Sequence, residues 1–332
     1  MWEKVERGEW REKCGEREGG LAMKGLAISL LLLVLTSCSE TNVGKPQSIG
    51  EPYDVVLVST DKSLLAMVRG MLGVTMAGLP QEELLFNVKT ARGGEINAAT
   101  QYDRNIVVVR RKGSHTRIRY ERNPYARNQL LVFIDTPSSA ALRADSAKTA
   151  KTLQRLIEQF ETKAAMDYDS QNHNLKSMKE IEKAIGCKIT IPADMRASKK
   201  GKDFIWISDN GQKTMRNVCI YTVNGIHVSQ SGIVSMRDSV MSANIKGERE
   251  GMAMTTERRA DVMFSKHGKG IMARGLWQME GDAMGGPFVS MTLADSVRNR
   301  TVTAEAFIYA PSTTKAKAMK RLEAILYTLE IE

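Results

Sequence analysis

The sequence predicts an α+β protein in which mostly antiparallel sheets are packed by long helices. Two observations favour this class. Strand-like runs come in groups rather than alternating strictly with helices, and each half of the chain ends with strands followed by one long helix. The halves are residues 53–168 and 169–332, and each is long enough to bury a modest core. Their shared order of elements suggests two similar halves, although no residue-level repeat supports a duplication.

The first half opens with a β-branched run at 54–60 and a helix over 61–72, whose leucine and valine residues fall on one stripe. Short apolar runs predict further strands at 79–89, 104–110, 117–122 and 129–135. A long helix is expected over 138–166, because Ser138 can cap its first turn.

The second half opens with a short helix over 175–185 that stops at Gly186, as helices often do. Segment 235–245 is compatible with either a helix or a strand, and a final helix is expected over 313–329. We expect Gly285-Gly286-Pro287 to form a turn, because glycine tolerates positive φ and proline fixes φ. Apolar and alternating runs predict strands at 187–192, 203–208, 217–223, 270–280, 287–293 and 301–310.

The apolar run 26–35 ends in Leu35-Thr36-Ser37-Cys38. It is too short to span a bilayer, which requires about 20 residues as a helix, but with one lysine before it the run matches a signal peptide. The tetrapeptide resembles a bacterial lipobox, in which the cysteine thiol takes a diacylglyceryl group, the chain is cut before the cysteine, and the new amino group is acylated, commonly with palmitate. We therefore predict an upstream extension and signal peptide at 1–37, with the start at Met23. Lipidation of Cys38 and a tether over 38–52 complete the prediction.

Two cysteines remain in the body of the chain, Cys187 and Cys219. In an oxidising envelope they could form a disulfide, and two buried thiols are the alternative. With so few cysteines, and with His115, His173, His227 and His267 scattered along the chain, we predict no metal site and no cofactor.

Three stretches carry a family resemblance: "LPQEELLFNV" at 79–88, "GLWQMEGDAMGGPFVS" at 275–290 and "AFIYAP" at 306–311. Together, behind a lipobox, they resemble an uncharacterised lipoprotein family of Bacteroidota, a domain of unknown function with no established activity. The resemblance implies a Gram-negative cell envelope. The residues after Cys38, "SETN", lack the acidic run of surface-exported lipoproteins, which favours a periplasm-facing anchor in either membrane.

Enzyme motifs give little support for catalysis. Ser312 and Lys315 match S-x-x-K, 208–210 match S-D-N, and Lys213-Thr214 begin a K-T-G, the set found in serine β-lactamases. The order along the chain is wrong, however, and Met215 replaces the glycine. We expect Ser312 to serve as a helix N-cap instead, and we predict no catalytic residues.

The chain has a net charge of +10, and seven of its lysines and arginines fall within 110–127. In a hairpin these charges would suit phosphates, sugars or acidic lipid headgroups, and the alternative is an ordinary solvated edge. Nucleic acid would fit the charge, but an envelope location argues against it. The candidate polyanion-binding residues are Arg110, Arg111, Lys112, Arg117, Arg119, Arg122 and Arg127.

The sequence thus favours a lipid-anchored envelope protein that binds or scaffolds an anionic envelope component or another protein. We expect it to contact the membrane through its N-terminal lipid. An envelope hydrolase with a site assembled from distant positions is the alternative.

Overall fold

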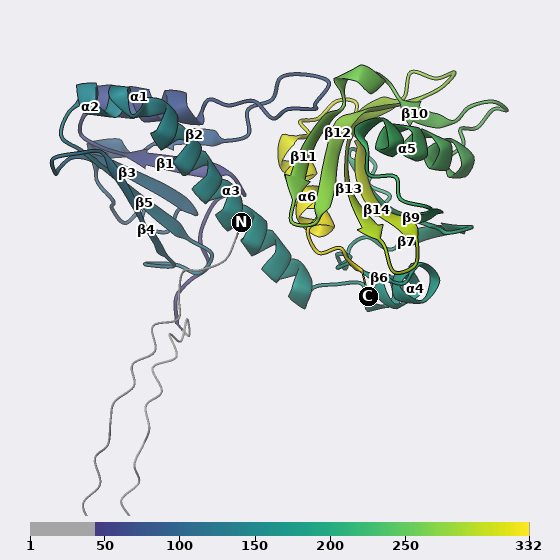
Figure 1. Ribbon diagram of the computed structural model, residues 1–332. Helices are drawn as coiled ribbons and strands as arrows, with labels where there is room; N and C mark the ends of the chain where they lie inside the picture. The colour runs from purple at the N-terminus through teal and green to yellow at the C-terminus, as the bar shows by residue number, and fades with distance from the viewer. Residues whose placement is uncertain (1–43, 332) are drawn as a thin grey trace, which may run out of the picture. The chain divides into compact units, whose positions relative to one another are not determined.

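The computed structural model describes residues 44–331, which build two large β-sheets with helices packed on them (Figure 1). The α+β class is confirmed. Residues 44–331 belong to one compact unit with its own hydrophobic clusters. The predicted leader, its start at Met23 and the lipidation site Cys38 lie outside the described residues. Within 44–331, no helix is long and apolar enough to cross a membrane.

The first sheet has five strands in the order β2-β1-β3-β5-β4. β1 pairs in parallel with both β2 and β3, β3 pairs in parallel with β5, and only β4 and β5 are antiparallel. This sheet is therefore mainly parallel, whereas the second sheet is antiparallel, so most strand pairs of residues 44–331 are antiparallel as the sequence predicted. The strands are β1 Asp54–Val58, β2 Asn87–Thr90, β3 Asn105–Arg111, β4 Arg117–Arg122 and β5 Leu130–Thr136.

Three helices cover one face of the first sheet: α1 Lys62–Leu72, α2 Ser139–Ala144 and α3 Ser146–Gln171. The long helix predicted over 138–166 is thus two helices, and Ser138 caps the first of them by accepting from the Ala141 amide. The opposite face holds a smaller apolar cluster, in which Ala91 and Ile96 from the connection between β2 and β3 pack on the sheet. The short 3-10 helix η1 Arg92–Gly94 belongs to this connection.

The second sheet is antiparallel, in the order β10-β12-β13-β14-β9-β8-β7 with β11 also paired to β12. The two large sheets thus differ in strand order and direction, and their topology does not support a duplication. The strands are β7 Ala197–Gly201, β8 Phe204–Ser208, β9 Met215–Asn224, β10 Met254–Thr256, β11 Met263–His267, β12 Gly270–Met279, β13 Gly285–Asp295 and β14 Arg300–Tyr309.

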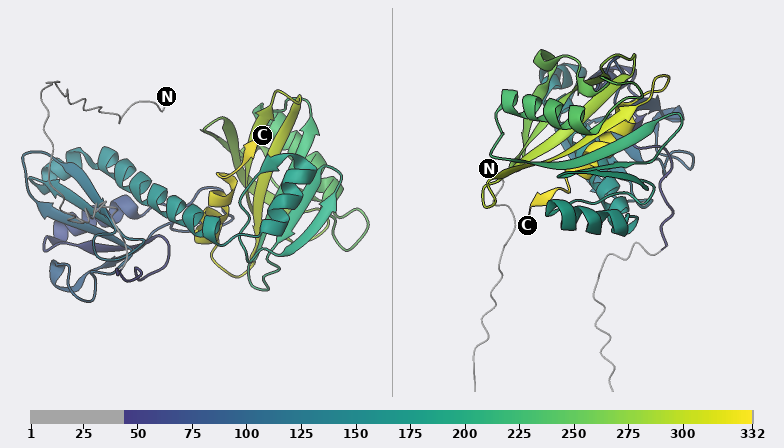
Figure 2. Two further views of the ribbon diagram at one scale, coloured as in Figure 1. Left: turned by 90° about the horizontal axis from the view of Figure 1, so that it is seen from below. Right: turned by 90° about the vertical axis from the view of Figure 1, so that its right-hand side faces the viewer.

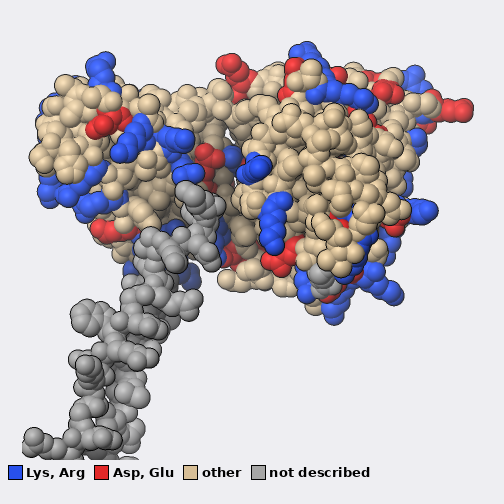
Figure 3. Space-filling view, in the orientation of Figure 1, with Lys and Arg blue, Asp and Glu red and all other residues tan. Residues whose placement is uncertain are grey.

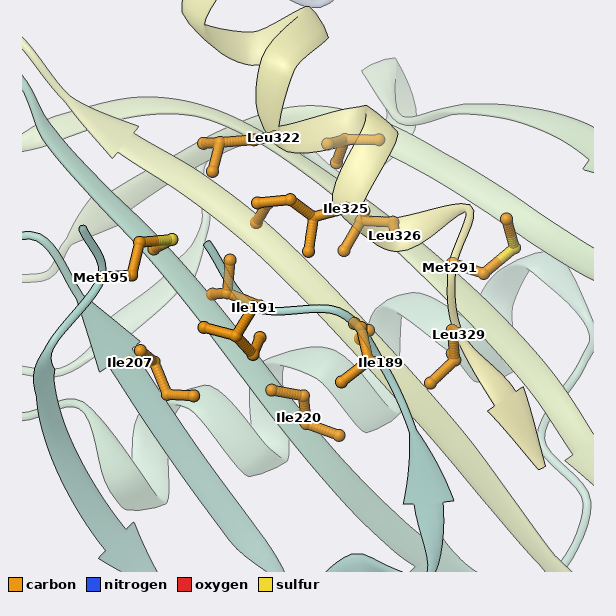
Figure 4. Close-up of a cluster of buried hydrophobic side chains, with 14 of the residues drawn as sticks. Ile189, Ile191, Met195, Ile207, Ile220, Met291, Leu322, Ile325, Leu326 and Leu329 are labelled. Carbon is orange, nitrogen blue, oxygen red and sulfur yellow. The ribbon is translucent and has the colours of Figure 1, made fainter. Parts of the chain in front are cut away.

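Helices pack on both faces of the second sheet, as Figure 2 shows. α5 Gln230–Asn244 covers one face, which resolves the ambiguous segment 235–245 as a helix. α4 Leu175–Ile185 and α6 Ala316–Leu326 cover the other face, together with the pair of β6 Cys187–Lys188 and β15 Glu330–Ile331. Figure 4 shows Leu322, Ile325 and Leu326 of α6 in the same apolar cluster as Ile207 and Ile220 of the sheet. A short 3-10 helix, η2 Arg259–Asp261, precedes β11.

The predicted turn at Gly285-Gly286-Pro287 is wrong, because all three residues lie in β13 and pair with β12. A Cβ on Gly286 would stand 2.2 Å from the carbonyl oxygen of Ile308, so the glycine allows close approach of two backbones rather than a turn. The chain reverses instead around Gly281, which has a φ of +79°.

Cys187 and Cys219 do not form a disulfide. Cys187 packs with α4 and α6 on one face of the second sheet, whereas Cys219 packs with α5 on the other face. Cys219 is a buried thiol, and burial raises its pKa well above the usual value, with the nearby Glu305 carboxylate adding to the shift.

Candidate functional site

The basic stretch 110–127 does not form the hairpin that the sequence predicted, because β5 lies between β3 and β4. Arg110 of β3 and Arg117 of β4 are both register partners of Asp135 on β5. The three residues therefore form one row across the sheet, on the face opposite α1 and α3. The intervening strand places an acidic residue in the middle of the predicted basic surface.

Asp135 is fully buried and accepts hydrogen bonds from three arginines. Its Oδ1 lies 2.6 Å from Arg110 Nε, while Oδ2 lies 3.4 Å from Arg117 Nε and 3.2 Å from Arg119 Nη2. Burial alone would raise the pKa of this carboxyl, but the hydrogen bonds and positive charge of Arg110 and Arg119 outweigh burial and lower the pKa. Asp135 is thus ionised at neutral pH, and the four side chains carry a net charge of +2.

The ring of Phe133, two residues before Asp135, packs against two of these arginines. The guanidinium carbons of Arg110 and Arg119 lie 4.9 and 5.1 Å from the centre of its ring, within the range of cation–π contacts. We call Arg110, Arg117, Arg119, Phe133 and Asp135 the Asp135 cluster. Its arginine side chains are 38–46% exposed, so N–H donors of fixed guanidinium groups remain open to a ligand.

A hollow of about 920 Å³ adjoins the Asp135 cluster and shares Arg110 and Phe133 with it. It lies outside the carboxyl ends of β1 and β3, where the chain places β2 on one side of β1 and β3 on the other. This is the topological switch point at which open sheets with parallel strands usually bind ligands. Besides residues at the ends of these strands, its walls come from the turn after β1 and from the η1 loop: Ser59, Thr60, Asp61, Gly94, Glu95 and Ile96.

Glycine is required in the η1 wall of this hollow. Gly94 has a φ of +70°, and a Cβ there would lie 2.7 Å from the carbonyl oxygen of Ser59. The loop backbone can therefore lie directly against the end of β1, which shapes the hollow without a side chain.

Asp61 and Arg111 form the edge of the hollow at the start of α1. Asp61 caps the helix by accepting from the amides of Ser63 and Leu64, and Arg111 Nη2 lies 2.7 Å from its Oδ2. The Ser63 hydroxyl, the Leu64 amide and Arg111 lower the pKa of Asp61 to about 2. The charge of Asp61 is therefore balanced locally and adds little repulsion toward an anion.

The structure brings together only part of the predicted basic set. Arg110, Arg117 and Arg119 meet at Asp135, and Arg111 lies at the neighbouring strand end. Arg122 lies 6.0 Å from the Tyr120 ring, on the other face of β4. Lys112 is exposed beyond β3, and the Arg127 backbone bonds to Pro46 and Ser48. In Figure 3, Lys and Arg side chains outnumber acidic ones over the visible face of the part of the molecule that contains the first sheet and its helices.

Sequence reasoning missed Asp135, Phe133 and the strand-end hollow. The one available signal was an aspartate at the end of the apolar run "QLLVFID", where a buried strand rarely carries a charge. The arginine partners of Asp135 could not be predicted. β4 follows β3 directly in sequence, so the sequence suggests that these two strands pair, whereas β5 lies between them in the sheet.

The enzyme-like motifs do not form a serine–lysine pair. The Lys315 ammonium donates to the carbonyl of Thr313, 2.8 Å away, and lies 4.0 Å from Glu83. Ser312 is not the N-cap of α6, because the amides of Lys315 and Ala316 donate instead to Glu83 Oε2, at 2.6 and 2.8 Å. Among residues 44–331, no cluster of His, Cys, Asp and Glu could hold a metal ion.

A second charged cluster is buried between α5 and the second sheet. Arg237 of α5 is 1% exposed and donates to Glu305 of β14, with Nη2 2.8 Å from Oε1. Its guanidinium also lies 3.9 Å from the centre of the Phe288 ring. Burial raises the pKa of Glu305 despite the opposing effect of Arg237. Because both side chains are buried, this pair holds α5 on the sheet rather than meeting a ligand.

Comparisons with known proteins identify two family models. Residues 48–168 match Domain of unknown function (DUF8532), and residues 174–328 match Domain of unknown function (DUF4837). The chain carries two domains of unknown function. This agrees with the expectation of an uncharacterised family. No curated protein matches the chain.

Two solved structures show weak similarity to parts of the chain. The Ran-binding protein Mog1p of Saccharomyces cerevisiae is 7% identical with a TM-score of 0.31, and the match covers 44% of this chain and 89% of Mog1p. The human StarD13 lipid transfer and protein localization domain is 8% identical with a TM-score of 0.18, covering 39% of this chain and 88% of that domain. Similarity this weak supports no inference about function.

Proposed function

We propose that this chain is a lipid-anchored cell-envelope protein that binds an anionic envelope component through the Asp135 cluster. One observation carries the proposal. Three arginines from two strands are fixed on one buried carboxylate, which leaves a net charge of +2 on partly exposed guanidinium groups beside a hollow of about 920 Å³. Guanidinium groups suit phosphate and carboxylate because their planar N–H donors match two oxygens at once.

The fixed geometry favours recognition over simple solvation. A free arginine side chain loses rotamer entropy when it binds, whereas Arg110 and Arg119 are already held by Asp135 and Phe133. The envelope location rests on the resemblance of Leu35-Thr36-Ser37-Cys38 to a lipobox. Lipid anchoring would confine the protein near anionic headgroups, where even weak contacts act at high effective concentration.

The test uses a soluble chain beginning at Ser39, which retains every described residue, and vesicles with and without anionic lipid. We expect it to bind the anionic vesicles and to weaken with added salt, because screening shortens the range of charge interactions to about 8 Å at physiological ionic strength. Each basic residue near an anionic surface contributes about 1 kcal/mol. Replacing Arg117 and Arg119 with Gln should therefore weaken binding about 30-fold.

A matched control separates the cluster from net charge. The double variant Arg122→Gln and Arg127→Gln removes the same two charges from the same stretch but leaves the Asp135 cluster intact. Both variants retain the 2.6 Å contact between Arg110 and Asp135, so the buried carboxylate keeps a partner. Equal losses in the two double variants would show that only net charge matters, and the cluster would then have no specific role.

A further inference from the structure

β4 is an edge strand of the first sheet, because it pairs with β5 on one side and with no other strand of residues 44–331 (Figure 1). It runs for six residues, five of which are exposed, and it contains neither proline nor glycine. An edge strand of this kind presents unpaired backbone N–H and C=O groups with which another chain can pair.

The register shows which backbone groups of β4 are open. In an antiparallel pair, residues that exchange hydrogen bonds alternate with residues that do not. The Leu130 amide donates to the carbonyl of Arg104, 2.8 Å away on the side of β3. Arg122, the register partner of Leu130, therefore does not bond to β5. By alternation, three residues of β4 point their backbone groups away from the sheet: Ile118, Tyr120 and Arg122.

The side chains of β4 leave this edge uncovered in the described part of the chain. Charged side chains often protect an edge strand, but Arg117 and Arg119 turn onto Asp135 over one face of the sheet. The opposite edge is different, because Arg69 donates to the carbonyl of Val88 on β2, at 2.8 Å. The first sheet thus closes one edge with its own side chain and leaves the β4 edge open.

A groove of about 250 Å³ lies beside the open edge, between β4 and the first turns of α3. The helix side contributes Asp145, Lys148, Thr149 and Thr152, and the strand side contributes Thr116, Arg117 and Ile118. Because side chains alternate between the two faces of a strand, every second side chain of a strand added to β4 would point toward this groove. An open edge for main-chain hydrogen bonds and a groove for alternate side chains are the two elements of peptide binding by strand addition.

The edge and its groove carry a net positive charge when the carboxylates that pair with the arginines are counted. Five cations and three carboxylates lie on β4, line the groove or contact Asp135, which leaves a net charge of +2. The cations are Arg110, Arg117, Arg119, Arg122 and Lys148, and the carboxylates are Glu121, Asp135 and Asp145. Neither Arg122 nor Lys148 forms an ion pair within residues 44–331. An acidic segment therefore suits this edge, whereas a second copy of β4, which has its own excess of arginine, does not.

We propose that the β4 edge binds an acidic, extended segment of a partner protein by strand addition. Backbone groups of the segment would pair with Ile118, Tyr120 and Arg122. Acidic side chains on one face of the segment would meet Arg119, and those on the other face would meet Lys148. This site goes beyond the strand-end hollow, with which the groove shares no lining residue.

The test uses the chain beginning at Ser39 and a short peptide of glutamate with valine at every third position. Fluorescence anisotropy of the labelled peptide measures affinity, and hydrogen exchange locates the contact. The outward amides of β4 should exchange about tenfold more slowly when the peptide is bound. The inward amide of Arg119, already bonded to β5, should not change. The same peptide with lysine in place of glutamate is the control and should not bind.

A proline variant tests whether the backbone of β4 makes the contact. Tyr120→Pro removes an outward N–H but no hydrogen bond to β5, and proline is tolerated on the open side of an edge strand. It should weaken peptide binding about tenfold, through the lost hydrogen bond and the obstructed edge. Tyr120→Thr keeps the amide and is the matched control, which should bind like the parent. Thermal melts check that both variants are folded.

A pair of charge variants tests the helix side of the groove. Lys148→Glu reverses a charge in the lining and should weaken the acidic peptide about fivefold. Lys151→Glu makes the same change at an exposed position of the same helix, outside the lining, and should bind like the parent.

Four outcomes would overturn the proposal: no binding of the acidic peptide, equal binding of the lysine peptide, unchanged exchange of the outward amides, or unchanged binding by Tyr120→Pro. A dimeric parent with a monomeric Tyr120→Pro variant would also overturn it, because a second copy would then occupy the edge. Anionic vesicles should bind Tyr120→Pro like the parent, because the Asp135 cluster is intact. The vesicle and peptide results therefore judge the two proposals separately.

Discussion

Glu83 caps the N-terminus of α6 from a segment more than two hundred residues away in the sequence. Its Oε2 accepts from the backbone amides of Lys315 and Ala316, at 2.6 and 2.8 Å, and its side chain is 10% exposed. No side chain of the helix's own first turn caps it. Replacing Glu83 with Ala therefore removes two charge-assisted hydrogen bonds and a negative charge at the positive end of a helix dipole.

The expected cost follows from these contacts. Losing an N-cap costs about 1 kcal/mol, and a carboxylate near a helix N-terminus contributes about 0.3–1 kcal/mol, more when it is partly buried as here. We expect Glu83→Ala to lower the free energy of unfolding by about 2 kcal/mol. Glu83→Gln keeps an acceptor but loses the charge, so its cost should be about half as large.

Urea unfolding measures these differences, and hydrogen exchange of the Lys315 and Ala316 amides locates them. Both amides should exchange faster in Glu83→Ala than in the parent. Ser312→Ala is the control, because the sequence alone assigns the cap to Ser312 whereas the structure assigns it to Glu83. A cost above about 1 kcal/mol for Ser312→Ala, together with an unchanged Glu83→Ala variant, would refute the structural assignment.

Two further predictions concern Asp135 and Cys38. Asp135→Asn should lower the free energy of unfolding by about 2 kcal/mol at pH 7. The loss is smaller than for a fully buried ion pair, because solvent screens the partly exposed arginines. Folding lowers the pKa of Asp135. The contribution of Asp135 to the free energy of unfolding is therefore complete above the pKa of the unfolded chain, about 3.9, and is lost as the pH falls through the pKa of the folded protein. The free energies of unfolding of the parent and of Asp135→Asn, measured in urea, should therefore become equal in acid. A difference between them that does not change with pH would contradict this. Cys38→Ala should leave uncleaved precursor that takes up no labelled fatty acid, and continued labelling would exclude Cys38 as the lipidation site.

Local sequence patterns were sufficient where one segment carries all the needed information. The helix over 175–185 and its stop at Gly186 were predicted to the residue, because an apolar stripe and a left-handed glycine are properties of that segment alone. The helix after Asp61 was predicted for the same reason, and its capping aspartate is adjacent in sequence. The α+β class likewise followed from grouped strands and long helices.

Contacts between distant segments were decided only by the tertiary structure. Placing β5 between β3 and β4 converts a predicted basic hairpin into arginines gathered on a buried aspartate, and Glu83 replaces Ser312 as the cap of α6. Gly286 similarly reflects the nearness of Ile308 on another strand rather than a turn. Periodicity and capping report which face of a segment is buried and where it ends. Strand order depends instead on the free energy of packing whole segments together, which no single segment of this chain encodes.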